Sequence, residues 1–149
     1  MSPLFRERLR IGLGTNWLTV AGYRRSPRSK PIRREVIPFE PASATAPWQA
    51  AVDALPTALA KAGKAEVTVV LSNHFVRYAL LPWSAALGSE EAWLAYAQHR
   101  FAAVHGAQAA QWTLRIAPTA WRGARVACAT ESALLEALRA RLGERNVRL

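Results

Sequence analysis

Residues 10–20 read Arg-Ile-Gly-Leu-Gly-Thr-Asn-Trp-Leu-Thr-Val, and this stretch decides the fold. Its turn, Gly14-Thr15-Asn16, separates two segments that read as strands: Arg8–Leu13, in which apolar residues alternate, and Trp17–Tyr23. Alternation with a period of two is typical of half-buried strands, and a short glycine-containing turn is hairpin chemistry. The stretch therefore predicts a β-hairpin near the amino terminus.

The segments that follow extend this hairpin into a larger sheet. A third strand is expected at residues 33–39, which makes an antiparallel meander. Apolar residues at helical spacing predict a helix over residues 48–62, which Pro56 is expected to bend or break. The β-branched run at residues 67–71 is typical of a strand buried on both faces. A meander, a crossover helix and a parallel strand predict a ribonuclease-H-like α/β lobe, assigned to residues 1–72.

The second half, residues 73–149, is predicted to form a strand-helix-strand-strand-helix lobe. Its strands are expected at residues 75–83, 111–117 and 122–130. Ser89 is expected to cap the first helix, whose buried stripe is Trp93, Ala97, Phe101 and Val104. Thr130 is expected to cap the second helix and Gly143 to end it. Residues 146–149 look like the start of a further strand.

Acidic residues are too few and too scattered for metal-dependent chemistry. The chain has one aspartate, Asp53, and nine glutamates that form no obvious cluster, whereas magnesium and two-metal nuclease sites need converging carboxylates. The histidines, His74, His99 and His105, fit no zinc spacing, and no nucleotide-binding glycine motif occurs. We therefore expect no catalytic residues, no metal and no cofactor, and we do not expect an enzyme.

Net charge is +10, and much of the excess lies between residues 24 and 34. A run of cations interrupted by prolines is expected to be a solvated loop or hairpin tip. Two interpretations stay open: a solvated turn, or a surface that attracts an acidic protein, anionic lipid headgroups or nucleic-acid phosphate. The predicted basic surface consists of Arg24, Arg25, Arg28, Lys30, Arg33 and Arg34.

Composition also bounds the compartment. The chain has no run of about 20 predominantly apolar residues and no secretory signal, so we expect a soluble cytoplasmic protein. Its one cysteine, Cys128, lies in an apolar run and is expected to be a buried structural thiol. The six tryptophans fall mostly at positions typical of a core.

Two segments resemble known proteins. Residues 10–20 resemble the first phosphate-binding hairpin of actin-like ATPases. The stretch Leu71-Ser-Asn-His-Phe-Val-Arg-Tyr-Ala-Leu-Leu-Pro-Trp83 is similar to the strand that enters the inserted lobe of PilM-type pilus-assembly proteins, with GspL-type secretion proteins as near relatives. The resemblance implies a scaffold at the cytoplasmic face of a bacterial inner membrane, which binds a short segment of a membrane-anchored partner. It also implies that the chain is the amino-terminal half of a longer protein.

The phosphate hairpin departs from the family at one position. The resemblance implies an aspartate where this chain has Gly12, which offers no carboxylate. Gly14 and Thr15 match the tight turn and could still approach a phosphate through backbone N–H groups. Without the acid and without the second phosphate loop of the family, hydrolysis of a nucleotide is not expected.

Three functions follow from these observations. The first is a non-catalytic scaffold for type IV pilus or type II secretion assembly, and the second is a basic nucleic-acid-binding module without nuclease acids. A nucleotide sensor without turnover is the third. For the scaffold we expect an extended partner peptide between the lobes, because residues 72–83 mix hydrogen-bonding and aromatic side chains. Its predicted contacts are Asn73, His74, Arg77, Tyr78 and Trp83.

Overall fold

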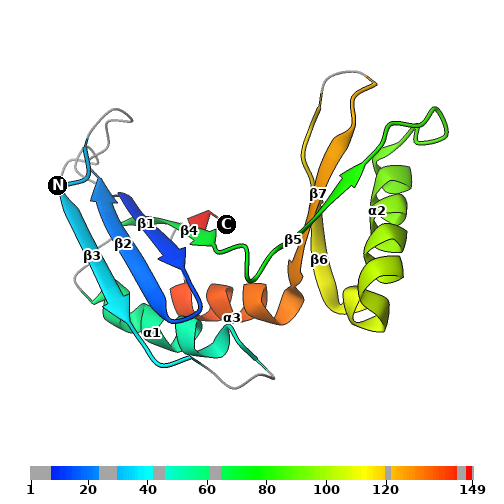
Figure 1. Ribbon diagram of the computed structural model, residues 1–149. Coiled ribbons are helices and arrows are strands. Elements are labelled where there is room, and N and C mark those ends of the chain that lie inside the picture. Colours follow the sequence, from blue (N-terminus) through cyan, green and yellow to red (C-terminus); the bar gives the residue numbers. More distant parts are fainter. Residues whose placement is uncertain are drawn as a thin grey trace. The chain divides into compact units, whose positions relative to one another are not determined.

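The computed structural model describes residues 8–23, 30–41, 46–60, 65–119, 122–143 and 147–148, the last two by their backbone alone. The chain divides into two compact units, each with its own sheet (Figure 1). Unit 1 comprises residues 1–74 and 136–149, and unit 2 comprises residues 75–135. The predicted basic residues Arg24, Arg25 and Arg28 lie outside the described part of the chain.

Unit 1 contains a five-stranded sheet in the order β3-β2-β1-β4-β8. Strands β1, β2 and β3 form an antiparallel meander, while β4 pairs in parallel with β1 and with β8. The strands are β1 (Arg8–Leu13), β2 (Trp17–Tyr23), β3 (Arg33–Pro38), β4 (Glu66–Leu71) and β8 (Val147–Arg148). The predicted meander and the parallel strand are confirmed, and the strand expected at residues 146–149 corresponds to β8.

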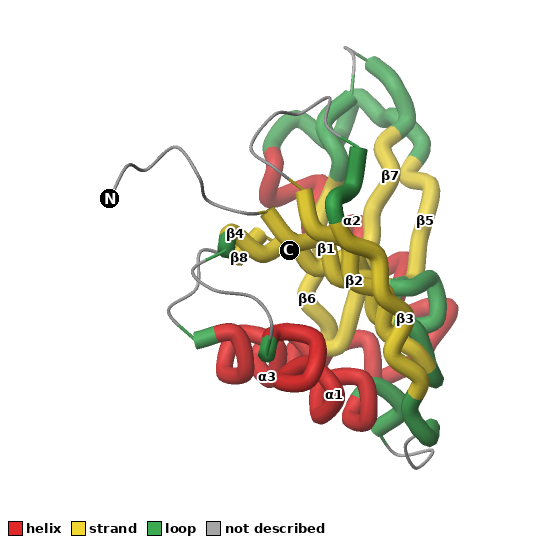
Figure 2. Tube along the Cα trace, turned by 90° about the vertical axis from the view of Figure 1, so that its left-hand side faces the viewer, coloured by secondary structure: helices red, strands yellow, loops and turns green. Residues whose placement is uncertain are grey.

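Two helices of this unit lie side by side on one face of the sheet (Figures 1 and 2). They are α1 (Gln49–Leu59) and α3 (Ser132–Leu142), and the boundary between the units falls within α3. The sheet residues that alternate toward one face are buried, namely Leu9, Ile11, Leu13, Leu18, Val20, Val67 and Val69. The opposite face is uncovered by any described element of unit 1.

Strand β4 was expected to be buried on both faces, and that prediction is wrong. Val67 and Val69 are buried, but Val70 is 54% exposed. Helix α1 was expected to bend or break at Pro56, yet it runs unbroken from Gln49 to Leu59. The proline removes one backbone hydrogen bond, but the buried apolar face that includes Leu55 extends across it. Tertiary packing keeps the segment helical.

Unit 2 contains a three-stranded antiparallel sheet in the order β5-β7-β6, covered on one face by α2. Its elements are β5 (Arg77–Leu81), α2 (Glu90–His105), a 3-10 turn (Gly106–Gln111), β6 (Trp112–Ile116) and β7 (Arg125–Glu131). The core between sheet and helix is Leu81, Trp93, Ala97, Phe101, Ala109, Ala127 and Ala129. The predicted strand-helix-strand-strand-helix order is confirmed.

The helix ends show which of the predicted caps form. Ser89 caps α2 as predicted, because its Oγ accepts a hydrogen bond from the backbone N–H of Ala92 at 3.1 Å. Thr130 does not cap α3: it lies in β7, and its hydroxyl donates to the carbonyl oxygen of Phe75 at 2.7 Å. Gly143 follows α3 with a φ of +57°, which ends the helix as expected. Val104 was assigned to the buried stripe of α2 but is 71% exposed.

The compact units divide the chain differently from the predicted lobes at residues 1–72 and 73–149. Residues 136–149 group with unit 1. The cause is that the second half of α3 contacts α1 through Arg141 and Asp53, while β8 pairs with β4. The end of the chain therefore returns to the first sheet.

Candidate functional site

The turn between β1 and β2 is closed by its own groups. The backbone N–H of Gly14 donates to the carbonyl oxygen of Trp17 at 2.9 Å, and the carbonyl of Asn16 accepts from the N–H of Phe39 at 3.0 Å. A Cβ at Gly14 would lie 2.7 Å from the indole of Trp17, so the ring packs directly against the glycine. The Gly14 N–H, predicted to be able to approach a phosphate, is thus already satisfied within the hairpin.

Gly12 is also enclosed. It pairs with Thr19 across the β1–β2 ladder, and a Cβ added at Gly12 would overlap the Thr19 hydroxyl. Any side chain here, including the aspartate that the resemblance implies, would have to displace Thr19. A side chain at this position therefore depends on rotation of the Thr19 hydroxyl.

The uncovered face of the first sheet carries a shallow hollow of about 480 Å³. One row of paired residues crosses it, Val36–Thr19–Gly12–Val70. The two valines at its ends are 64% and 54% exposed, whereas its middle positions are small, so the row is low at its centre. The hollow is lined further by Arg10, Leu13, Trp17, Ala21, Leu71, Ser72 and Asn73.

Cations lie at one end of this hollow. Arg8 is paired with Glu66 at 3.0 Å, and the Arg10 guanidinium lies 5.8 Å from the centre of the Tyr23 ring. Arg34, opposite Ala21 on β3, is exposed. Among the described residues neither Arg10 nor Arg34 is paired with a carboxylate. An apolar floor with cations at one end suits a ligand that combines apolar and acidic groups.

The five predicted partner contacts are all exposed, but they are divided between the units. Asn73 and His74 belong to unit 1, where Asn73 lines the same hollow as Gly12. Arg77, Tyr78 and Trp83 belong to unit 2, where Trp83 lies 5.4 Å beneath the Arg122 guanidinium. That one peptide contacts all five stays a prediction.

Sequence reasoning missed Arg10, Trp17 and Val70 as parts of the site. Their signal was present in the strand alternation, because the same register that buries Ile11 and Val69 directs Arg10 and Val70 to the uncovered face. What the sequence could not indicate was that this face lacks a described helix.

The predicted basic surface is only partly a solvated segment. Lys30 is exposed, but Arg33 and Arg34 lie within β3 and point to opposite faces. Arg34 is exposed on the uncovered face, whereas the Nε and one Nη of Arg33 are shielded from solvent. The expectation of a solvated loop through residue 34 is therefore wrong, whereas the strand expected from residue 33 is confirmed, because pairing with β2 continues through both residues.

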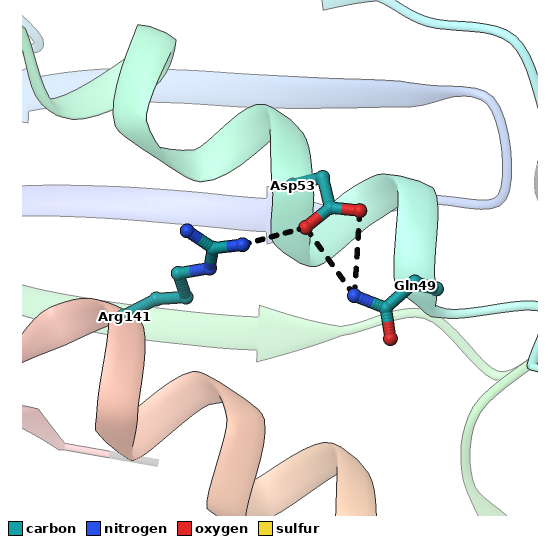
Figure 3. Close-up of polar contacts among 3 residues, drawn as sticks. All are labelled: Gln49, Asp53 and Arg141. Carbon is teal, nitrogen blue, oxygen red and sulfur yellow. Dashed lines mark hydrogen bonds and ion pairs between the residues drawn. The ribbon is translucent and has the colours of Figure 1, made fainter.

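Three described carboxylates, Glu66, Asp53 and Glu90, form ion pairs with arginines. Asp53 of α1 is 2.8 Å from Arg141 of α3 and 3.3 Å from the amide of Gln49 (Figure 3). Glu90 is 2.6 Å from Arg125. Within the described ranges no three His, Cys, Asp or Glu side chains are grouped closely enough to hold a metal ion. Cys128, expected to be buried, is partly exposed on the face of β7 away from α2.

The tryptophans divide between core and surface. Trp48 and Trp93 are buried as predicted, and Trp112 packs edge-on against Phe101 at 6.2 Å. Trp17 and Trp83 are more than 40% exposed. These two therefore add aromatic surface rather than core, and Trp121 lies outside the described residues.

Comparison with known proteins identifies solved structures with a similar fold. No family model matches the chain, and no curated protein matches it. The cytoplasmic domain of EpsL, an inner membrane component of the type II secretion system of Vibrio cholerae, superposes with a TM-score of 0.67 at 11% identity. A protein of unknown function with an actin-like ATPase fold from Bacteroides thetaiotaomicron superposes with a TM-score of 0.56 at 13% identity.

The matches cover 95% and 99% of this chain but 55% and 54% of those chains, so it spans about half the length of each. At these identities the likeness shows that the chain has an actin-like α/β fold. No described helix is long and apolar enough to cross a membrane.

Proposed function

We propose that the chain is a non-catalytic scaffold of a type IV pilus or type II secretion assembly at the cytoplasmic face of the bacterial inner membrane. In this role it binds a short segment of a membrane-anchored assembly protein. The fold likeness to the cytoplasmic domain of EpsL supports the type of assembly. The single observation that carries the proposal is the closed hairpin, in which Trp17 occupies the space beside Gly14.

Closure of the hairpin argues against nucleotide chemistry in physical terms. A phosphate loop works because unsatisfied backbone N–H groups point at the phosphate oxygens. Here the Gly14 N–H is bonded to Trp17, and the side-chain space of Gly12 is filled by Thr19. A nucleotide that used the Gly14 N–H would have to break that hydrogen bond and displace the indole beside it. An actin-like fold that keeps its shape but closes this turn is better suited to binding proteins than to turnover.

The hollow beside that hairpin is the site we assign to the partner segment in unit 1. Trp17 offers an aromatic wall, Val70 an exposed apolar rim, and Asn73 an amide that can bond to a peptide backbone. Tryptophan and arginine are the side chains that most often anchor interfaces. The expected segment places apolar side chains over Thr19 and Gly12 at the centre of the hollow. It also places a carboxylate near the Arg10 guanidinium.

The test is calorimetric titration with synthetic peptides that cover the cytoplasmic segments of membrane-anchored proteins encoded beside this chain. One peptide is expected to bind saturably, and Trp17→Ala is expected to weaken it by about tenfold or more, as at an interface anchor. Val104→Ala, an exposed apolar position in unit 2, serves as the control and should bind like the parent. Binding that is unaffected by Trp17→Ala would place the segment elsewhere.

One observation favours nucleic acid as a second candidate. The uncovered sheet face carries Trp17 and Tyr23 together with Arg10, and aromatic rings interleaved with arginine can stack unpaired bases. The same face also exposes Ile32, Val36 and Val70, which offer a polynucleotide neither charge nor stacking. Affinity for single-stranded DNA that falls steeply with salt and is lost in Trp17→Ala would favour this candidate over the scaffold.

A further inference from the structure

Strand β5 of unit 2 is a free sheet edge. It forms one side of the order β5-β7-β6, and its pairing among the described residues is with β7 alone (Figure 2). Such an edge presents a row of backbone N–H and C=O groups to solvent, and it is a template for another strand. Its side chains on the face away from α2, Tyr78 and Leu80, are 59% and 63% exposed.

Other described edges carry charges or proline along the strand, whereas β5 carries one charge, Arg77, at its first residue. Strand β3, at one edge of the first sheet, contains Arg33, Arg34, Glu35 and Pro38. Strand β6, at the other edge of the second sheet, has Arg115 on its open face. Charges and proline on edge strands are the usual protection against pairing. Residues 78–81 of β5 read Tyr-Ala-Leu-Leu, with neither a charge nor a proline.

The sequence of β5 is complementary to itself. If two copies pair antiparallel about a two-fold axis at Ala79, Tyr78 lies opposite Leu80 of the second copy, and Leu80 opposite its Tyr78. Two exposed aromatic–aliphatic pairs then cover one another on the open face, and such pairs directly opposite each other stabilise antiparallel sheets. Ala79 meets its own equivalent, which lets the backbones approach without a clash.

Charge is compatible with this register. Arg77 lies opposite Leu81 of the second copy rather than opposite another Arg77. Leu81 is next to Arg125 in the sheet, and Arg125 is already paired with Glu90 at 2.6 Å. Unit 2 holds five arginines and three glutamates, a formal +2 out of the chain's +10, so most of the charge that would repel a second copy lies outside it.

We propose that two copies of this chain associate through strand β5, which joins their second sheets into one six-stranded antiparallel sheet. The contact requires no partner protein, so it goes beyond the proposed scaffold function. A strand pair of this length buries little area, which places it among weak, concentration-dependent interfaces. An isologous contact of this kind closes a dimer and does not propagate into fibres.

The register gives the proposal a sharp test by sedimentation at physiological salt. The parent chain should show a reversible monomer–dimer equilibrium. In the double variant Tyr78→Lys/Leu80→Lys, a lysine of each copy lies opposite a lysine of the other at two positions. The dissociation constant of the dimer should rise by about tenfold or more. Tyr78→Lys/Leu80→Glu places opposite charges there and should bind at least about tenfold more tightly than the double-lysine variant. The control Val104→Lys, on α2, should dimerise like the parent.

A disulfide test checks the register independently. Cys128 is adjacent to Tyr78 in the sheet, so the background is Cys128→Ser. Directly opposite residues have Cα atoms about 4.5–5.5 Å apart, which a disulfide can bridge. A mixture of Tyr78→Cys and Leu80→Cys chains should oxidise to the mixed dimer faster than either variant alone forms its own. A chain that stays monomeric throughout, equal dimerisation of the two charge variants, or no preference for the mixed disulfide would each overturn the proposal.

Discussion

At the scale of single residues, the hairpin glycines differ in what encloses them. Gly14 is enclosed by the indole and the carbonyl of Trp17, whereas Gly12 is enclosed by a single hydroxyl on Thr19. A hydroxyl can rotate away, but a backbone carbonyl that accepts the Gly14 hydrogen bond cannot move without losing it. The two glycines are therefore not equivalent.

We predict that Gly14→Ala destabilises the chain more than Gly12→Ala. Overpacking costs about 1–3 kcal/mol, and Gly14→Ala should lie toward the upper end of that range. Gly12→Ala should cost only about 1 kcal/mol, similar to a forced change of rotamer at Thr19. Thermal and denaturant unfolding measure both, with Gly88→Ala as the matched control, because a Cβ there meets no atom within 4 Å.

Thr19 provides the internal check on this prediction. In a Thr19→Ala background the cost of Gly12→Ala should fall, since the hydroxyl that it displaces is gone, while the cost of Gly14→Ala should not change. The difference is a coupling free energy from a double-mutant cycle. Equal costs for Gly12→Ala in both backgrounds would show that Thr19 is not what keeps this position a glycine.

At the scale of elements, strand β3 shows two neighbouring arginines with different roles. We predict that Arg34→Glu leaves the melting temperature nearly unchanged, because the side chain is exposed on the uncovered face. Arg33→Glu should lower stability by about 1–3 kcal/mol, because it places a carboxylate where guanidinium nitrogens are shielded from solvent. Thermal unfolding of the two variants side by side is the measurement. Equal melting temperatures would contradict the assignment of their faces.

Helices α1 and α3 are joined by an ion pair and each buries apolar side chains, and we expect the apolar burial to contribute more stability than the ion pair. Asp53 and Arg141 are each about half exposed, and such surface pairs contribute about 0–1 kcal/mol. Asp53→Asn should therefore cost less than about 1 kcal/mol, whereas Leu138→Ala, at a fully buried position of α3, should cost about 2–5 kcal/mol. A larger loss for Asp53→Asn than for Leu138→Ala in denaturant unfolding would reverse this ranking.

The elements also show what could be predicted from sequence. The short turn at Gly14-Thr15-Asn16 between two strand-like segments predicted the hairpin, because turn chemistry of this kind is local and does not depend on what surrounds it. The prediction for β4 failed. A run of apolar residues predicted burial on both faces, but Val70 is exposed. Thr130 and Pro56 misled for a related reason, since a local preference for a cap or a break was overridden by strand pairing and by helix packing.

The site was harder to predict than the fold. Gly12, Gly14 and Asn73 were identified, but the hollow that brings Gly12 and Asn73 together depends on the parallel pairing of β1 with β4, a contact between residues distant in sequence. Trp17 was included among six tryptophans that fall mostly at positions typical of a core. Only the structure shows that it lies on the uncovered face and closes the turn at Gly14.

At the scale of the whole molecule, we predict that this actin-like fold binds a protein segment and does not bind a nucleotide, because its β1–β2 turn is closed. One calorimetric experiment can test separately whether the chain binds a nucleotide and whether it binds a peptide. The chain is titrated with MgATP and, in parallel, with the peptides that cover the cytoplasmic segments of neighbouring membrane-anchored proteins. Both titrations use the same protein, buffer and temperature, so their heats are directly comparable.

We expect a flat MgATP titration and saturable binding of one peptide, weakened by Trp17→Ala. A flat trace is expected because the Gly14 N–H and the space beside Gly12 are both occupied within the hairpin. A dissociation constant for MgATP in the low micromolar range, about −7 to −8 kcal/mol of binding free energy, with no peptide bound, would contradict the account.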